Sequence, residues 1–183
     1  NFISKLSALA IAEAKKRSKW VLPSVCIAQA ALETGWGTSA LMTKANAYFG
    51  IKATASWKGK VYNSSTKECY DGKTYTDITA YFRAYDSVED SVKDYFDLIT
   101  GSSRYSAAVN VKDAEKAITA IKNGGYATDP TYITKIMNKQ ANDGSGLVYG
   151  MGHAVYTLSD PRAVILRRYA DKFSKMCGRE EEF

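Results

Sequence analysis

The sequence predicts a mainly α fold of the α+β class, in which one β-hairpin forms a lobe over a cleft in a helical domain. Two observations carry this prediction. Apolar residues recur at helical spacing through most of residues 1–142, whereas one stretch, residues 57–85, alternates with the period of two that is typical of strands. At 183 residues the chain can bury one good core but hardly two full domains.

The first two helices are expected before residue 35. An amphipathic helix with a basic end is predicted from Ile3, Leu6, Leu9, Ala10 and Ile11, followed by Lys15, Lys16 and Arg17. The second begins at Pro23, which suits a first turn, and stops at Gly35, which tolerates a left-handed backbone. From Val25 to Leu32 it is apolar on every side except at Gln29, so we expect it inside the core.

Glu33 falls in the last turn of this central helix, where a carboxylate is unfavourable for stability. Burial disfavours its charged form, and the negative end of the helix dipole does the same. Both effects raise its pKa, which suits a general acid that works near neutral pH. The alternative is a side chain that escapes to solvent at the helix end, and the spacing alone favours that alternative.

A short helix over Thr38–Lys44, with Leu41 and Met42 turned inward, and a loop over Ala45–Lys52 are expected next. In that loop Asn46 and Tyr48 are candidates for lining a cleft. Core packing is the preferred role for Phe49 and an equal alternative for Tyr48.

The hairpin is predicted from Asp71-Gly72, a strong two-residue turn signal. The strand after it has a half-buried face formed by Thr76, Ile78, Ala80 and Phe82. Residues 63–68, before it, are polar on both faces, and such a strand gains little from burial. We therefore expect the hairpin to be a mobile lobe over the cleft.

The helices after the hairpin begin at Ser87, which resembles a capping box with Asp90. The buried stripe of this helix is predicted to be Val88, Val92, Tyr95, Phe96 and Ile99. Further helices are expected over residues 105–110, 113–122 and 130–142. Asp129 is expected to cap the last of these, with Pro130 at its first position.

The composition argues against several classes of protein and of binding site. The longest apolar runs are too short to span a bilayer, so no membrane insertion is expected. A net charge of +6 from scattered residues argues against a nucleic-acid groove but favours approach to an anionic cell wall. Three cysteines far apart and one histidine predict neither a metal site nor a disulfide framework, and no signal peptide is visible at the N-terminus.

Four motifs, in order along the chain, carry a family resemblance. They are Ala31-Leu32-Glu33-Thr34-Gly35-Trp36-Gly37, Asn46-Ala47-Tyr48-Phe49-Gly50-Ile51-Lys52, Phe82-Arg83-Ala84-Tyr85 with the Ser87 helix, and Tyr126-Ala127-Thr128-Asp129-Pro130-Thr131-Tyr132. Over residues 3–139 the chain resembles family 73 glycoside hydrolases, the peptidoglycan β-N-acetylglucosaminidases of autolysins and phage endolysins. The resemblance implies a lysozyme-like helical domain over residues 1–142.

The resemblance also implies the reaction and its residues. Glu33 corresponds to the general acid, and Glu68, in a Thr-x-Glu context in the hairpin, to a second carboxyl group; a solvated strand carboxylate is the alternative for Glu68. Tyr126 would line the cleft and hold the sugar or its N-acetyl group near Glu33. Inverting hydrolysis and participation of the substrate's own acetamido group stay open as mechanisms. The predicted substrate-binding residues are Trp36, Asn46, Tyr48, Phe49 and Tyr132.

The expected substrate is the glycan strand of peptidoglycan, cleaved between N-acetylglucosamine and N-acetylmuramic acid without a cofactor. The alternatives are a muramidase that cleaves the other bond and a wall-binding module with a disabled site. Action in the cell wall is expected for an autolysin, and storage in the host cytoplasm before release for a phage endolysin.

The tail, residues 143–183, resembles a short internal segment of citrate synthases through Gly-Met-Gly-His153-Ala-Val-Tyr and Asp-Pro-Arg162-Ala. In that family the matching His and Arg bind oxaloacetate, but the segment lacks the rest of that active site. We therefore expect an appended fragment, a loop and a helix over Pro161–Lys175, rather than an acyl transferase. Its apolar residues need cover, either on the hydrolase domain or, as slightly preferred, in a homodimer.

Overall fold

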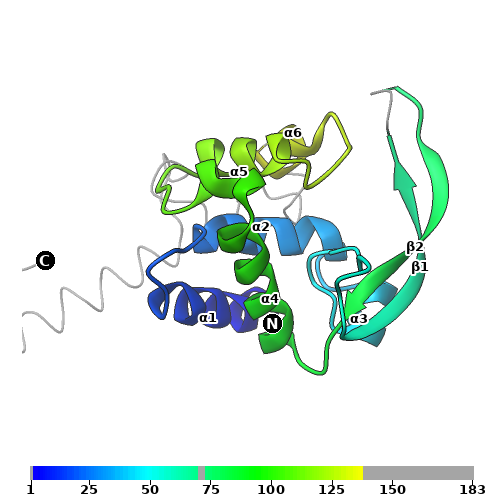
Figure 1. Cartoon of the computed structure of the whole chain (residues 1–183), viewed down its shortest axis with the longest axis horizontal. Helices are drawn as coiled ribbons and strands as arrows, with labels where there is room; N and C mark the ends of the chain where they lie inside the picture. Colours follow the sequence, from blue (N-terminus) through cyan, green and yellow to red (C-terminus); the bar gives the residue numbers. More distant parts are fainter. Residues whose placement is uncertain (1, 70–72, 138–183) are drawn as a thin grey trace, which may run out of the picture. The chain divides into compact units, whose positions relative to one another are not determined.

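The computed structural model describes residues 2–69 and 73–137. Its elements are α1 (Phe2–Lys15), α2 (Pro23–Thr34), α3 (Ala40–Ala45), β1 (Lys60–Glu68), β2 (Thr76–Ala84), α4 (Val88–Gly101), the 3₁₀ helix η1 (Ser103–Ala108), α5 (Ala114–Asn123) and α6 (Tyr132–Met137). Figure 1 shows the helices grouped around α2, with the hairpin of β1 and β2 beside them. The predicted mainly α fold with one hairpin is confirmed.

Helix α2 is the centre of the core, as its apolar sequence predicts. It packs against α1, α5 and α6. Its buried residues, each at most 3% exposed, include Val25, Cys26, Ile27, Ala28, Gln29, Ala30 and Ala31. Pro23 occupies its first turn, and Gly35 ends it in the left-handed region at φ 53°.

Helix α4 covers the core with the predicted stripe, and Ser91 is buried with it. Ser87 caps this helix, since its Oγ accepts the N–H of Asp90 at 3.1 Å. Helix α4 also packs against α1. There Arg17 Nη1 donates to Asp97 Oδ1 at 2.7 Å, so a charged pair joins the two helices at their rim.

The strands of the hairpin pair antiparallel over Lys60–Glu68 and Thr76–Ala84, and the last pair is Glu68 with Thr76. The predicted turn residues, Asp71 and Gly72, lie outside the residues that the structure describes. The polar β1 strand alternates between exposed residues and half-buried ones, the latter on the face that carries Glu68.

The hairpin is anchored at both ends, which the sequence did not indicate. At its base the N–H of Arg83 donates to Ile51 O, and the N–H of Ala53 to Tyr81 O, each at 2.8 Å. Beyond the last strand pair, the N–H of Cys69 donates to Thr128 Oγ1 at 3.2 Å. The independent movement of this lobe stays a prediction.

The 3₁₀ helix η1 begins earlier than the helix predicted over residues 105–110, whereas α3, α5 and α6 begin later than predicted. Helix α3 starts at Ala40 because Ser39 Oγ accepts the N–H of Met42, and Leu41 and Met42 are only half-buried. Helix α6 starts at Tyr132 rather than at Pro130. Asp129 does cap this turn, since its Oδ1 accepts the N–H of Thr131 at 2.8 Å.

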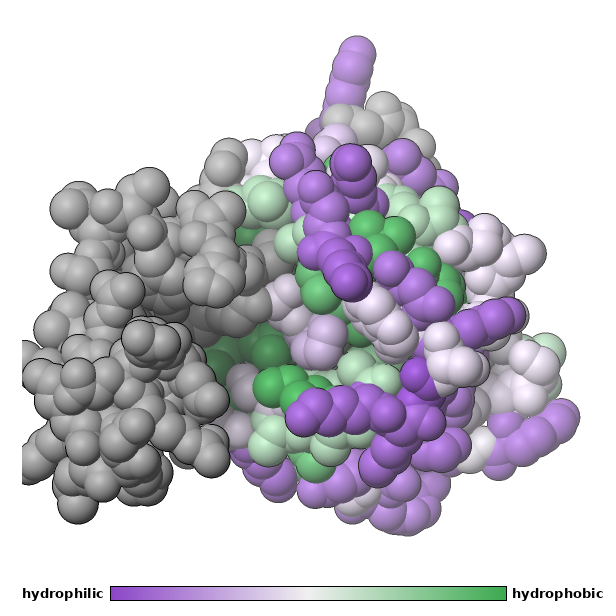
Figure 2. All heavy atoms as spheres, turned by 90° about the vertical axis from the view of Figure 1, so that its left-hand side faces the viewer, coloured by the Kyte–Doolittle hydropathy of each residue, from purple (hydrophilic) through white to green (hydrophobic). Residues whose placement is uncertain are grey.

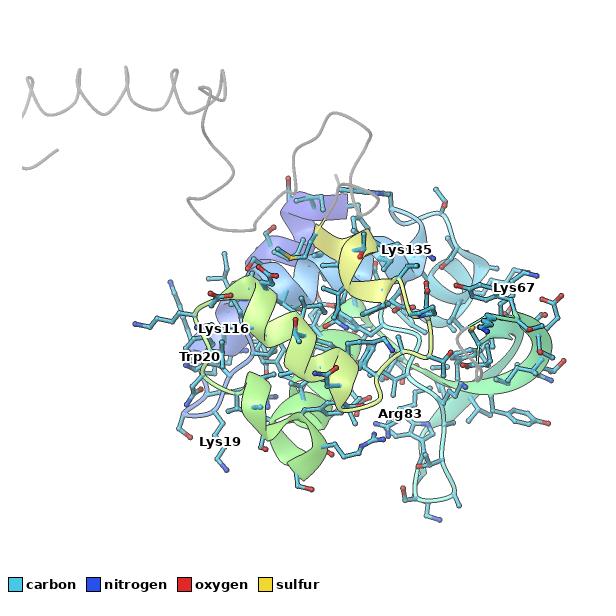
Figure 3. All side chains as sticks on the ribbon, turned by 90° about the horizontal axis from the view of Figure 1, so that it is seen from above. Lys19, Trp20, Lys67, Arg83, Lys116 and Lys135 are labelled. Carbon is cyan, nitrogen blue, oxygen red and sulfur yellow. The ribbon has the colours of Figure 1, made fainter. Side chains whose placement is uncertain are left out.

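The surface is mixed in character. Figure 2 shows a face on which hydrophilic side chains predominate and hydrophobic ones form small groups between them. In Figure 3, Lys19 and Lys116 lie on one side of the described part and Lys67 and Lys135 lie toward the other, so these four charges are not gathered on one face. No helix within the described ranges has the length and apolarity needed to cross a bilayer.

Candidate active site

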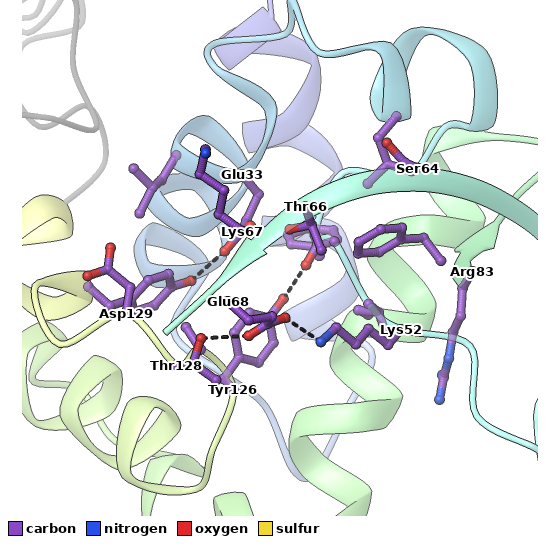
Figure 4. A pocket seen from close by; sticks show the side chains of 18 of the residues that line it. Glu33, Lys52, Ser64, Thr66, Lys67, Glu68, Arg83, Tyr126, Thr128 and Asp129 are labelled. Atoms are coloured by element: carbon purple, nitrogen blue, oxygen red, sulfur yellow. Dashed lines mark hydrogen bonds and ion pairs between the residues drawn. The ribbon is translucent and has the colours of Figure 1, made fainter. Parts of the chain in front are cut away.

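A cleft of about 640 Å³ runs between the helical core and the hairpin. Its walls come from the end of α2, the loop after α3, the inner face of β1 and the segment before α6. Figure 4 shows Glu33 and Glu68 in this cleft, the first from α2 and the second from β1. The fold therefore brings together two carboxyl groups that are 35 positions apart in sequence.

Glu33 is held partly buried by the end of α2, so the alternative of a side chain that escapes to solvent does not occur. The hydroxyl of Tyr132 donates to its Oε1 at 2.9 Å. The pKa of Glu33 is raised to about 7: burial is the largest cause, the hydrogen bond from Tyr132 lowers the pKa, and the nearby charge of Glu68 raises it. A carboxyl group with this pKa is protonated in a large fraction of molecules near neutral pH and can then deliver its proton to a leaving oxygen.

Gly50 lies against the other oxygen of Glu33. A Cβ on this residue would sit 3.2 Å from Glu33 Oε2, and its φ of +57° is left-handed. A side chain here would therefore press on the carboxyl group and strain the backbone as well.

Gly50→Ala is expected to lower the free energy of unfolding by about 1–2 kcal/mol, the cost of a left-handed backbone at a non-glycine residue. It should also lower turnover, because the new methyl group displaces Glu33 Oε2. Urea unfolding and wall-clearing assays would measure both effects. Gly101→Ala is the matched control, since no atom lies within 4 Å of its Cβ position; equal losses in the two variants would contradict this prediction.

Glu68 is 7% exposed, so it is not the solvated strand carboxylate that was the alternative. Its Oε1 accepts a hydrogen bond from Lys52, and its Oε2 accepts the Thr128 hydroxyl at 2.6 Å. Burial raises the pKa of Glu68, but the hydrogen bonds from Lys52 and Thr128 and the charge of Lys52 hold it below its ordinary value. Glu68 therefore stays ionised.

Glu33 and Glu68 thus differ in protonation. Glu33 keeps its proton up to a pH of about 7, whereas Glu68 is ionised well below that. Such a separation assigns an acid and a base to one site. Hydrolysis of a glycosidic bond needs these two roles on either side of the reacting carbon.

Tyr126 lies in the cleft wall, but its hydroxyl is not directed at Glu33. It donates to the backbone oxygen of Phe49 at 2.7 Å, on the loop opposite. The phenol that contacts Glu33 belongs to Tyr132, six positions further on. Tyr126 therefore lines the cleft, as expected, and joins the segment before α6 to the loop after α3; its role in holding the sugar stays a prediction.

Of the other predicted substrate-binding residues, some line the cleft and others lie outside its lining. Phe49 and Tyr132 line the cleft, whereas Trp36, Asn46 and Tyr48 do not. Asn46 ends α3 at φ 48° and donates to Tyr85 O at 3.1 Å. Tyr48 stacks on Phe2 with ring centroids 5.9 Å apart. In this structure Asn46 and Tyr48 stabilise the loop; sugar binding by Trp36, Asn46 and Tyr48 stays a prediction.

Four residues of the site were missed from the sequence: Gln29, Gly50, Lys52 and Thr128. Lys52 and Thr128 belong to the quoted motifs, and only the fold shows that both contact Glu68. Gln29 carried a signal, since it is the one polar residue in the apolar run of α2. Within the two described ranges, no three His, Cys, Asp or Glu side chains gather in a way that would hold a metal ion.

The family model described as mannosyl-glycoprotein endo-beta-N-acetylglucosaminidase matches residues 8–142, well over half of the chain. The chain belongs to the glucosaminidase family. The resemblance to family 73 glycoside hydrolases is thereby confirmed, and the match spans both Glu33 and Glu68. A second model, for the citrate synthase C-terminal domain, matches residues 107–183. His153, Arg162 and Cys177 fall outside the residues that the structure describes.

Two curated relatives of this glucosaminidase domain are named as a peptidoglycan hydrolase and an exo-glucosaminidase. The peptidoglycan hydrolase FlgJ of Vibrio parahaemolyticus is 40% identical over 69% of this chain, and the exo-glucosaminidase LytG of Bacillus subtilis is 41% identical over 63%. The chain spans 42% of the length of each. A mutant peptidoglycan hydrolase of Sphingomonas sp. A1, known from its crystal structure, is 37% identical with a TM-score of 0.67, over 74% of this chain and 88% of that one.

Proposed function

We propose that this glucosaminidase domain hydrolyses the β-1,4 bond between N-acetylglucosamine and N-acetylmuramic acid in peptidoglycan. The observation that carries the proposal is the pair of carboxyl groups in one cleft, Glu33 protonated near neutral pH and Glu68 ionised. Glu33 gives its proton to the glycosidic oxygen as the bond breaks. The names of the relatives support peptidoglycan as the substrate.

Glu68 takes the second role in this proposal. As an ionised group on the hairpin, it activates the attacking water or orients the acetamido group of the substrate. The hydrogen bonds from Lys52 and Thr128 keep Glu68 ionised, so that it is able to accept a proton. No cofactor takes part in either route, and we propose action at the cell wall for an autolysin and an endolysin alike.

Mass spectrometry of digested peptidoglycan tests the proposal. Fragments with reducing N-acetylglucosamine ends are expected. Fragments with reducing N-acetylmuramic acid would instead identify a muramidase. Binding to cell walls without any fragments would identify a binding module, and either of these results would overturn the proposal.

We propose further that residues 143–183 are an appended segment outside the catalytic domain. The match to the glucosaminidase family ends at residue 142, which supports this boundary. Truncation after Asn142 is expected to leave peptidoglycan cleavage essentially unchanged, because the lining residues of the cleft that lie in the described ranges all precede that point. Loss of cleavage in the truncated chain would contradict it.

Light scattering of both chains would show whether the segment pairs two copies, as we expect; a monomer in both cases would refute pairing.

A further inference from the structure

Gln29 is the polar residue in the middle of the core, where it is 0% exposed. Its amide group joins two tyrosine hydroxyls from different helices. The Tyr95 hydroxyl on α4 donates to Gln29 Oε1, and Gln29 Nε2 donates to the Tyr132 oxygen on α6 at 2.9 Å. Tyr132 in turn donates to Glu33 Oε1. An unbroken chain of hydrogen bonds therefore leads from α4 through α2 to the carboxyl group in the cleft.

The direction of this chain is set at Tyr95. This residue is fully buried, and the acceptor for its single hydroxyl proton is Gln29 Oε1. That bond orients the amide, so its nitrogen faces Tyr132. Because an amide nitrogen only donates, the Tyr132 oxygen must accept, and its own proton goes to Glu33. If the Gln29 amide were turned round, its nitrogen would face Tyr95. The buried hydroxyl proton of Tyr95 would then lose its acceptor, which is unfavourable.

The direction of the chain decides which oxygen of Glu33 carries the acid proton. Oε1 already accepts the proton of Tyr132, so a protonated Glu33 holds its own proton on Oε2. Oε2 lies beside Gly50, a residue of the cleft wall. We propose that Gln29, oriented by Tyr95, is a positioning residue that keeps the transferable proton of Glu33 on Oε2. This inference rests on the proposed function only in calling that proton transferable.

The ionisable groups around Glu33 are few in the described part of the chain. Glu68, paired with Lys52, is the carboxylate whose charge acts on it. Tyr95, Tyr126 and Tyr132 are phenols whose pKa burial raises above its ordinary value, so they stay neutral. Above the range in which Glu68 is protonated, a titration near neutral pH therefore reports Glu33.

The test is Tyr95→Phe, read by carbon NMR of chains labelled at the glutamate carboxyl carbon. The Glu33 signal is assigned as the one lost in Glu33→Gln. Without the Tyr95 proton, the amide can turn and accept from Tyr132, whose oxygen then accepts a proton from Glu33 Oε1. This arrangement favours the neutral acid, so the pKa of Glu33 is expected to rise above 7 while turnover falls.

Tyr85→Phe is the matched control. It also removes one hydrogen-bonded tyrosine hydroxyl, here one that donates to Asp94 Oδ2 at 2.7 Å, and neither Tyr85 nor Asp94 lines the cleft. The titration of Glu33 should be unchanged in this variant. An unchanged or lowered pKa of Glu33 in Tyr95→Phe, or an equal rise in the control, would overturn the proposal. A lowered pKa of Glu33 in Tyr95→Phe would indicate that water enters near the Gln29 amide, rather than that the amide turns.

Neutron diffraction of the unsubstituted chain at a pH well below 7 gives an answer even if Tyr95→Phe does not fold. A deuteron on Glu33 Oε2 is expected, and a deuteron on Oε1 would refute the assignment. Neither measurement requires turnover. If the chain failed to cleave peptidoglycan, the proposed function would be refuted. The two measurements would still decide which oxygen of Glu33 carries the proton.

Discussion

Glu33→Gln is expected to lower the rate of peptidoglycan cleavage by roughly 10²–10⁴-fold, the usual contribution of a general acid. The amide keeps the volume of the side chain and its acceptor for Tyr132, but it has no acid proton to deliver. Loss of turbidity of a cell-wall suspension would measure the effect. Glu89→Gln, the same change at an exposed position of α4, should clear walls at the normal rate. Near-normal activity of Glu33→Gln would exclude Glu33 from the mechanism.

The same substitution is expected to stabilise the fold at high pH. The pKa of Glu33 is about 7 in the folded chain against an ordinary value of 4.5, so folding binds a proton between these values. The free energy of unfolding of the unsubstituted chain must then fall as pH rises through this window. Glu33→Gln escapes this loss, and above pH 7 it should be more stable by up to roughly 3 kcal/mol. Urea unfolding at pH 4 and at pH 8 should show a difference only at the higher pH.

Glu68→Gln is expected to reduce turnover less than the loss of the acid does, at or below the lower end of the range of roughly 10²–10⁴-fold. Water or the acetamido group of the substrate can partly replace it. We expect a moderate loss of stability, roughly 1–2 kcal/mol, because the amide loses the charged pair with Lys52 at a position where the Glu68 side chain is nearly buried. The polar sequence of β1 had suggested almost no loss.

Asp77→Asn is the matched control for Glu68→Gln. It changes another carboxylate of the hairpin, one that pairs with Lys67 where both side chains are about two-thirds exposed. An exposed pair contributes little, so stability and turnover should stay within experimental error. If Glu68→Gln behaved like this control in both assays, Glu68 would have neither a catalytic nor a structural role.

The helices could be predicted because each buries a continuous stripe. The buried residues of α4 are those that the spacing of its apolar positions indicates. The hairpin was predicted from the alternation along its second strand, whereas the predicted turn residues, Asp71 and Gly72, lie outside the residues that the structure describes. The sequence around Lys60–Glu68 shows no apolar face, and so gave no indication of which side faces the cleft.

The raised pKa of Glu33 could be predicted from the sequence, but its hydrogen-bond partners could not. Burial at the end of an apolar helix is a local property, so the raised pKa of Glu33 follows from the sequence of α2. Tyr126 and Tyr132 belong to one motif, and spacing does not tell which hydroxyl points at which carboxyl group. The fold decides, because Tyr126 finds a backbone oxygen and Tyr132 finds Gln29 and Glu33.

The alternation of side chains along β1 restricts how this hairpin can change in length during evolution. Glu68 faces the cleft because it shares a parity with Tyr62, Ser64 and Thr66, counted from the anchored base of the hairpin. Insertion of one residue between the base and Glu68 would turn its carboxylate to the outer face, whereas insertion of two would return it to the cleft. Unless a bulge absorbs the change, active descendants should gain or lose residues in this strand by even numbers.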